Sequence, residues 1–140
     1  MAHSKANRRV IYDRTSGKCH ICGKQLAFTN YAAFGDKGAW EVEHSNARVR
    51  GGTDRLNNLY PACIYCNRSK GAVTTRTARA WEGRTRAPLS REKRKSAKRE
   101  NAFLGGAVGF LAGAALAGTP LGWIGLGIGA LGGYNMDPDT

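Results

Sequence analysis

Four cysteines are the residues of this 140-residue chain whose spacing most directly indicates chemistry. They form two close pairs, Cys19-x-x-Cys22 and Cys63-x-x-Cys66, which lie far apart in the chain. Tetrahedral zinc needs four thiolates that converge from two short turns, and pairs of this spacing are typical of such sites. Two disulfides in a secreted protein are the alternative. Because the polar segment 1–9 lacks the apolar stretch of a signal peptide, we expect zinc.

The second cysteine pair opens a segment, 63–71, that we predict to be helical. Cys63 and Cys66 are three residues apart, so they would share one helix face and bind the same ion. Asn67 and Lys70 have the same separation on a neighbouring stripe of the helix. A helix pinned by zinc would thus present an amide and an ammonium group together, an arrangement that suits a metal-bound phosphate.

Short elements must position these residues. We predict a short helix within 6–16, a strand at 40–44, where apolar and polar residues alternate, and a second strand at 59–60. The stretch Arg50-Gly51-Gly52-Thr53-Asp54 is a strong turn signal between the two strands. The pattern therefore predicts a small domain of the α+β class.

The stretch from Arg8 to about Ala72 resembles the HNH endonucleases, the ββα-metal nucleases that here carry an added zinc knuckle. Each matching piece is short, but their order and spacing together are specific to that family. The pieces are Arg14, Gly17-Lys18-Cys19-His20-Ile21-Cys22-Gly23, Val42-Glu43-His44, Gly51-Gly52-Thr53-Asp54, Asn58-Leu59 and Cys63-Ile64-Tyr65-Cys66-Asn67-Arg68-Ser69-Lys70-Gly71. The resemblance implies a zinc-stabilised ββα-metal fold.

The resemblance also implies a catalytic role for four residues. His44, which closes the first strand, corresponds to the general base that activates water. Glu43 before it and Asn67 on the helix correspond to the protein ligands of the catalytic divalent ion. Asn58 corresponds to the residue that orients the base, so the pattern is His-Asn-Asn. The implied reaction is hydrolysis of DNA phosphodiester bonds with Mg²⁺ or another divalent cation, while Zn²⁺ in the knuckle is structural.

The side chains themselves agree with this chemistry. Phosphodiester hydrolysis needs an activated water and a cation that stabilises charge on the phosphate. An imidazole with an unperturbed pKa of about 6.5 accepts a proton at neutral pH. The other histidine within the matched pieces, His20, lies between Cys19 and Cys22. Since four thiolates already complete a tetrahedral zinc site, we expect His20 on the surface.

The chain is strongly basic, with 22 Lys and Arg against 10 Asp and Glu and a net charge of +12. All of the basic residues precede Asn101. Such an excess indicates a polyanionic partner, nucleic acid first and anionic lipid second. Because phosphate contacts dominate affinity for DNA, the basic residues near the proposed site are candidates for DNA binding. They are Arg48, Arg50, Arg55, Arg68 and Lys70.

The segment 101–136 has no charged residue. Small residues at intervals of four line one helix face and let two backbones approach closely, so this tail resembles glycine-zipper membrane segments. A disordered Gly-rich tail is the alternative. We expect a helical hairpin that turns at Thr119-Pro120, associates with membrane lipid and packs against other tails. The regularly spaced glycines are Gly105, Gly109, Gly113, Gly125, Gly129 and Gly133.

These features predict three regions: an HNH nuclease domain over 6–83, a basic linker helix over 84–100 with Ser90 as its N-cap, and a glycine-zipper tail over 101–136. We expect a DNA endonuclease of low sequence specificity. Its cationic flank would keep the nuclease domain on the cytoplasmic side of the membrane. Two alternatives remain: a non-catalytic, membrane-tethered DNA-binding protein that contains zinc, and a nuclease toxin with a membrane-active tail.

Overall fold

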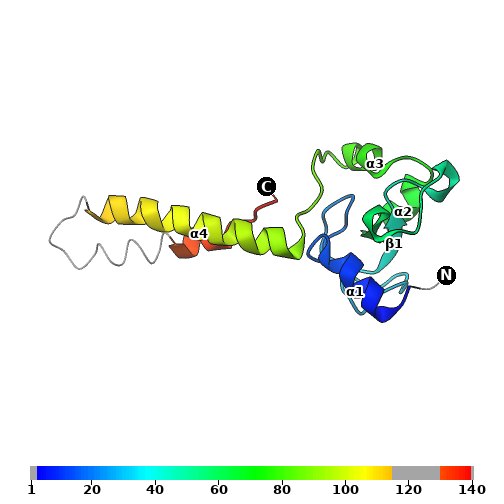
Figure 1. Ribbon diagram of the computed structural model, residues 1–140, viewed down its shortest axis with the longest axis horizontal. Helices are drawn as coiled ribbons and strands as arrows, with labels where there is room; N and C mark the ends of the chain where they lie inside the picture. Colours follow the sequence, from blue (N-terminus) through cyan, green and yellow to red (C-terminus); the bar gives the residue numbers. More distant parts are fainter. Residues whose placement is uncertain (1–2, 115–129, 140) are drawn as a thin grey trace. The chain divides into compact units, whose positions relative to one another are not determined.

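The computed structural model describes residues 3–114 and 130–139, and the chain divides into two units, Met1–Arg91 and Glu92–Thr140. The first unit contains every residue to which the sequence assigns chemistry. Its elements in chain order (Figure 1) are α1 (Lys5–Asp13), β1 (Trp40–His44), η1 (Arg48–Arg50), η2 (Leu56–Asn58), β2 (Leu59–Cys63), α2 (Ile64–Lys70) and α3 (Thr75–Trp81).

The two strands and α2 form a ββα unit. β1 and β2 pair antiparallel, with His44 opposite Leu59 and Trp40 opposite Cys63. His44 therefore lies at the end of the hairpin where residues 45–58 connect the strands, and Cys63 lies at the other end, where α2 begins. α2 contacts both strands, and α1 contacts β2 (Figure 1). The predicted α+β class and the predicted strand at 40–44 are confirmed.

A small core surrounds Trp40. Its side chain is fully buried, and its ring centroid lies 5.4 Å from that of Tyr12, 6.2 Å from that of Phe28 and 5.0 Å from that of Tyr31. Ile11 of α1 is also fully buried. A domain of this size buries limited apolar surface, so interactions other than the core must contribute to its stability.

The connection between the strands, residues 45–58, closes on itself around the side chain of Asn58. The Asn58 amide donates to the carbonyl oxygens of Asn46 at 3.0 Å and Thr53 at 2.9 Å, and its oxygen accepts from the Asn46 N–H at 2.7 Å. Gly52 approaches the same stretch so closely that a Cβ at this position would be 1.8 Å from the Asn46 carbonyl oxygen. Only glycine fits at position 52.

The second unit contains nearly all of α4 (Arg91–Ala114), a helix of 24 residues. The predicted linker helix forms the first part of α4, so the predicted boundary between linker and tail falls within one continuous helix. Within the described ranges, no helix is both long and apolar enough to cross a membrane. The predicted turn at Thr119-Pro120 and the predicted contacts of Gly129 lie outside the described residues.

A short helical stretch at 130–135 lies against the first part of α4. A Cβ on Gly133 would be 2.1 Å from the Asn101 carbonyl oxygen, so the two backbones approach closely because Gly133 has no side chain. Arg94 forms an ion pair with Asp137 at 2.8 Å and another with Asp139. The two described ends of the tail therefore lie side by side within this unit.

We predict that Gly52→Ala destabilises the first unit, because the added methyl group meets backbone atoms that cannot move aside as a flexible side chain would. Overpacking of this kind costs roughly 1–3 kcal/mol. For a domain of this size each kcal/mol lowers Tm by about 4–8 °C, which thermal unfolding followed by circular dichroism measures. Gly132→Ala is the matched control, because a Cβ there meets nothing within 4 Å. An unchanged Tm for Gly52→Ala would contradict the close approach.

Candidate metal centre and active site

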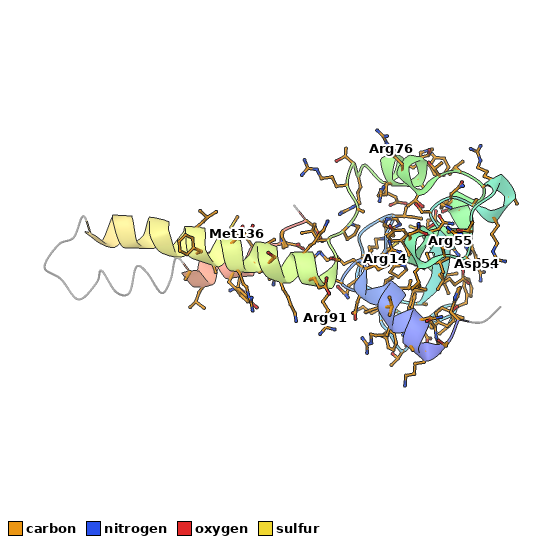
Figure 2. All side chains as sticks on the ribbon, in the orientation of Figure 1. Arg14, Asp54, Arg55, Arg76, Arg91 and Met136 are labelled. Carbon is orange, nitrogen blue, oxygen red and sulfur yellow. The ribbon has the colours of Figure 1, made fainter. Side chains whose placement is uncertain are left out.

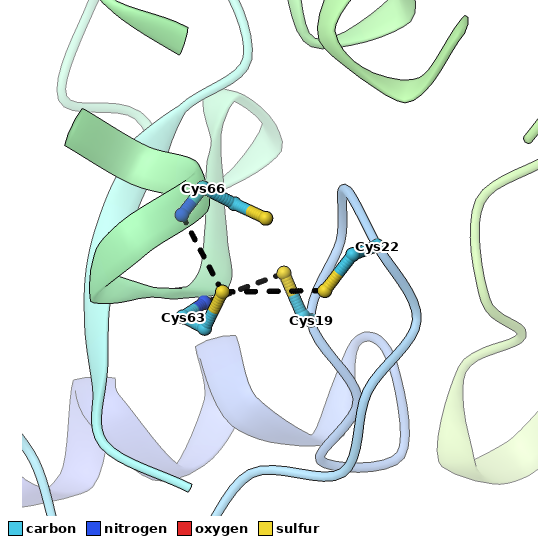
Figure 3. A group of neighbouring side chains, drawn as sticks. All are labelled: Cys19, Cys22, Cys63 and Cys66. Atoms are coloured by element: carbon cyan, nitrogen blue, oxygen red, sulfur yellow. Dashed lines mark hydrogen bonds between the residues drawn. The ribbon is translucent and has the colours of Figure 1, made fainter. Parts of the chain in front are cut away.

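Local backbone structure directs both cysteine pairs into one cluster (Figure 3). The first pair lies on a tight turn, in which the Cys19 N–H donates to the Lys24 carbonyl at 2.8 Å and the Gly23 N–H donates to the Cys19 carbonyl at 2.9 Å. Cys63 is the N-cap of α2, and its sulfur accepts from the Cys66 N–H at 3.4 Å. The turn and the helix start therefore bring four sulfurs together.

The geometry of this cluster fits a zinc ion. The four Sγ atoms all lie within 4.8 Å of one another, and those of Cys22 and Cys63 are 4.0 Å apart. Sulfurs about 2.3 Å from one tetrahedral zinc ion would be about 3.8 Å apart. All four cysteines are free and none of them forms a disulfide. The prediction of a four-cysteine metal site is confirmed at the level of its ligands.

Crowding changes how readily these thiols ionise. A hydrogen bond with the Cys19 thiol lowers the pKa of Cys63 to about 7 and lowers the pKa of Cys22 well below its usual range. The pKa of Cys19 itself is raised, chiefly by its hydrogen bond with Cys22. The pKa of Cys66 is also raised, chiefly by its hydrogen bond with Cys19, so two thiols of the cluster ionise more readily than a free thiol and two less readily.

We predict that Cys66→Ser releases zinc and unfolds the first unit. A structural zinc ion contributes on the order of 10 kcal/mol to folding, which a small core cannot replace. Elemental analysis should find one zinc ion per wild-type chain and less in the variant, and circular dichroism should show loss of folded structure. Ser69→Ala, on the same helix, is the control and should keep its zinc. Wild-type protein that is folded but free of zinc would contradict the prediction.

His44 is held at the end of β1 by Asp54. The His44 Nε2 atom lies 2.7 Å from Asp54 Oδ1, and the Arg48 guanidinium lies 2.5 Å from the same carboxylate. The hydrogen bond from Arg48 lowers the pKa of Asp54 to about 2, so this carboxylate is an acceptor at neutral pH. Arg48 Nε also lies 3.3 Å from Nε2 of His44. In the tautomer that donates from Nε2 to Asp54, the lone pair lies on Nδ1, the nitrogen that can then accept a proton.

His44 and Asn67 line the same recess, which has a volume of about 310 Å³. Its walls include Arg48 and the residues at the end of α2. The Asn67 amide nitrogen donates to Glu41 Oε2 at 2.9 Å. In this orientation the amide oxygen of Asn67 is the atom that can bind a cation. The structure thus brings together the predicted general base and one predicted ion ligand.

Glu43 lies in a buried network instead of lining that recess. Its side chain is fully buried. Its Oε1 atom accepts from His20 Nδ1 at 2.7 Å and from Thr75 Oγ1 at 2.9 Å. Its Oε2 atom accepts from Thr75 Oγ1 at 3.0 Å and lies 3.5 Å from the Lys70 ammonium. The second predicted ion ligand is therefore held by protein groups on each oxygen.

The predicted surface position of His20 is wrong. Only 4 % of the residue is exposed, and its ring stacks on that of Tyr60 with centroids 3.8 Å apart. The backbone N–H of His20 donates to the Pro61 carbonyl at 2.8 Å, which connects the cysteine turn to β2. Burial lowers the pKa of His20. Its Nε2 accepts from Arg79 Nη1 at 3.0 Å, because arginine can only donate, and the ring proton on Nδ1 points towards Glu43.

Two partners in this network, Thr75 and Arg79, belong to α3, which sequence analysis missed. Thr74 is the N-cap of α3, and its hydroxyl accepts from the Thr77 N–H. A threonine followed by residues of good helix propensity is the signal that could have predicted this helix.

The basic residues predicted to bind DNA differ in exposure. Lys70 is buried, and its ammonium donates to the His44 carbonyl at 2.7 Å. It therefore supports the backbone of His44, and it also lines the recess of His44 and Asn67. The four arginines of the predicted set are exposed: Arg48, Arg50, Arg55 and Arg68.

The family model of the HNH endonucleases matches residues 19–72. This span contains both cysteine pairs, both strands, α2 and the recess of His44 and Asn67. Residues 19–72 therefore form an HNH endonuclease domain, as the sequence resemblance indicates. No curated protein and no solved structure matches the chain. The domain indicates a nuclease or DNA-binding function, and HNH nucleases use divalent metal ions.

Proposed function

We propose that this protein is a metal-dependent endonuclease that hydrolyses phosphodiester bonds of DNA with low sequence specificity. One observation carries the proposal: His44 and Asn67, from different elements of the HNH domain, line the same recess. A base and a cation ligand on one recess are the two groups that phosphodiester hydrolysis requires. The hydrogen bond between His44 and Asp54 adds to this, because it leaves Nδ1 able to accept a proton.

In this mechanism His44 removes a proton from the attacking water through Nδ1. The carboxylate of Asp54, 2.7 Å from Nε2, stabilises the positive charge that the imidazole gains. Lys70 and Asn58 are positioning residues: Lys70 binds the His44 carbonyl at 2.7 Å, and Asn58 closes the connection that follows His44. Neither positioning residue exchanges a proton with the substrate.

Asn67 and Glu43 are the proposed ligands of the catalytic divalent ion. An amide oxygen and a carboxylate oxygen are hard donors of the kind that Mg²⁺ prefers, so their donor chemistry fits. Glu43 is fully buried, so to bind a cation it would have to exchange its contacts with Thr75 or Lys70 for that ion. A divalent ion held by these two residues would supply charge stabilisation for the phosphate and the leaving oxygen.

The exposed arginines of the domain are proposed to hold the DNA backbone. Arginine binds phosphate through a planar fork of N–H donors. Contacts to phosphate fix the position of the protein on the duplex but carry no information about base sequence. A DNA-binding surface of this kind favours low sequence specificity. Its proposed members are Arg48, Arg50, Arg55 and Arg68.

We predict that the protein cleaves supercoiled plasmid only when a divalent ion is present, and that His44→Ala slows cleavage by about 10²–10⁴-fold because the general base is lost. Gel electrophoresis of nicked and linear products measures the rate. Zinc content is measured in parallel, since a chelator strong enough to remove structural zinc would unfold the domain. A His44→Ala variant that keeps its zinc and cleaves at the wild-type rate would show that His44 is not the base.

The same assay separates the proposed ion ligand from its neighbour on β1. Glu43→Gln and Asn67→Ala should raise the Mg²⁺ concentration that gives half-maximal cleavage. Asp36→Asn, which changes an exposed carboxylate outside the recess, is the control. Glu41→Gln tests the neighbouring carboxylate on the same strand, which accepts from the Asn67 amide at 2.9 Å. A raised Mg²⁺ requirement for Glu41→Gln alone would assign the ion to Glu41. Binding of DNA without any metal-dependent cleavage would favour the non-catalytic alternative.

The proposal also includes the tail, residues 101–136. We propose that it associates with membrane lipid and with other tails, and that the nuclease domain lies in the cytoplasm. The full-length chain should float with anionic lipid vesicles in a density gradient, whereas a chain that ends at Glu100 should stay at the bottom and still cleave DNA. The physical reason is the uncharged composition of the tail beside a cationic segment. Recovery of the full-length chain apart from the vesicles would refute membrane association. Growth arrest on expression would favour the toxin alternative.

A further inference from the structure

A second recess lies in the first unit, between the connection 45–58 and α3. It has a volume of about 490 Å³. The residues that line it include no acidic side chain, and two of them are arginines, Arg76 and Arg79, both on α3. Thr74, Asn46 and Asn58 add hydroxyl and amide groups to its walls. A recess that combines positive charge with hydrogen-bond donors is suited to an anion.

Only some of the hydrogen-bond donors of the Arg79 guanidinium have partners among the described residues. Its Nη1 atom donates to His20 Nε2 at 3.0 Å, which fixes the orientation of the group. Its Nε atom is buried and has no hydrogen-bond partner among the described residues. The inner part of the Arg79 side chain is therefore enclosed by protein, and the residue also lines the recess.

Arg76 supplies the exposed part of the recess. It lies three residues before Arg79 on α3, so the two side chains share one side of that helix. Figure 2 labels Arg76 on this helix. Both arginines therefore line one recess from the same helix. Arg79 is bonded to His20, and Arg76 is exposed to solvent.

Residues that line the two recesses are adjacent in the chain. His44 lines the first recess, and the next two residues, Ser45 and Asn46, line the second. Consecutive Cα atoms are about 3.8 Å apart, so the Cα atoms of His44 and Asn46 lie within about 8 Å of each other. A strand that placed one phosphate at His44 would therefore carry a neighbouring phosphate towards the second recess.

We propose that Arg76 and Arg79 form a phosphate subsite that binds the DNA backbone next to the bond that is cut. The inference rests on the proposed function, because it takes His44 as the place of cleavage. Two guanidinium forks match the oxygens of a backbone phosphate, and the recess positions the strand without contacting bases. α3 lies beyond residues 19–72, so this subsite is supplied by a segment outside the part that the family model matches.

The first test measures binding apart from cleavage. Fluorescence anisotropy gives the affinity of the full-length protein for a short DNA duplex over a range of salt concentrations, without added magnesium. Arg76→Gln should weaken binding and lower the slope of log affinity against log salt by about 1, the change expected for one lost phosphate contact. Arg86→Gln, which removes the same charge from an exposed residue outside the recess, is the matched control. Equal slopes for the two variants would overturn the subsite.

The second test locates the phosphate. A duplex with a single methylphosphonate lacks one backbone charge, and the wild-type protein should then cut poorly at the bond next to the neutral position. The Arg76→Gln variant has already lost the contact, so the methylphosphonate should not reduce its cleavage at that bond any further. For Arg79→Lys, too, the methylphosphonate should not reduce cleavage at that bond further. Zinc content and Tm of this variant are measured as well, because Arg79 also donates to His20. Additive effects of the Arg76 variant and the methylphosphonate at every bond would overturn the proposal.

The two tests also separate the subsite from the nuclease. If the protein binds DNA through Arg76 but never cleaves it, the proposed catalytic function fails and the phosphate recess stands. If the protein cleaves DNA and Arg76→Gln behaves as Arg86→Gln does in both assays, the phosphate subsite is refuted and the proposed nuclease function is kept.

Discussion

The convergence of four cysteine thiols from two distant segments is the interaction on which the rest of the first unit depends. The cluster joins the turn of the first pair to the point where β2 ends and α2 begins, because Cys63 is both the last residue of β2 and the N-cap of α2. The core around Trp40 is small, and a domain of this size has little apolar surface to bury. A metal ion shared by the four thiols would therefore hold the strand and the helix in register. That register places Asn67 of α2 beside the end of β1.

A buried polar network extends from this cluster to the candidate active site. His20 sits between two of the cysteines, yet its ring reaches across to Glu43, the residue before His44. Thr75 and Arg79 of α3 bind the other side of the same network. In a low-dielectric interior such networks specify one arrangement, since each unpaired member would be costly. One network thus connects the zinc ligands, the strand of the general base and α3. A change in any of these parts should alter the position of His44.

Local patterns in the sequence predicted the elements whose cause is local. The strand at 40–44 follows from alternating apolar and polar residues, and the cysteine turns follow from ligand spacing with flanking glycines. The positions of His20 and Lys70 have other causes. His20 is paired with a residue 23 positions away, and Lys70 with one 26 positions away. A charged or polar side chain is expected on the surface unless a partner is known, and these partners come from distant parts of the chain.

The sequence by itself determined the chemistry that is available: four thiols with the spacing of a zinc site, a histidine at the end of a strand, and an amide on the following helix. Ligand spacing and side-chain type are properties of short segments, so folding did not have to be known to recognise them. Only the tertiary structure decided that Asp54 and Arg48 lie at Nε2 of His44, that Glu43 is enclosed by His20 and Thr75, and that α3 adds an arginine-lined recess. Burial, tautomer and recess shape arise where segments far apart in the chain meet, and no local pattern of residues encodes such a meeting.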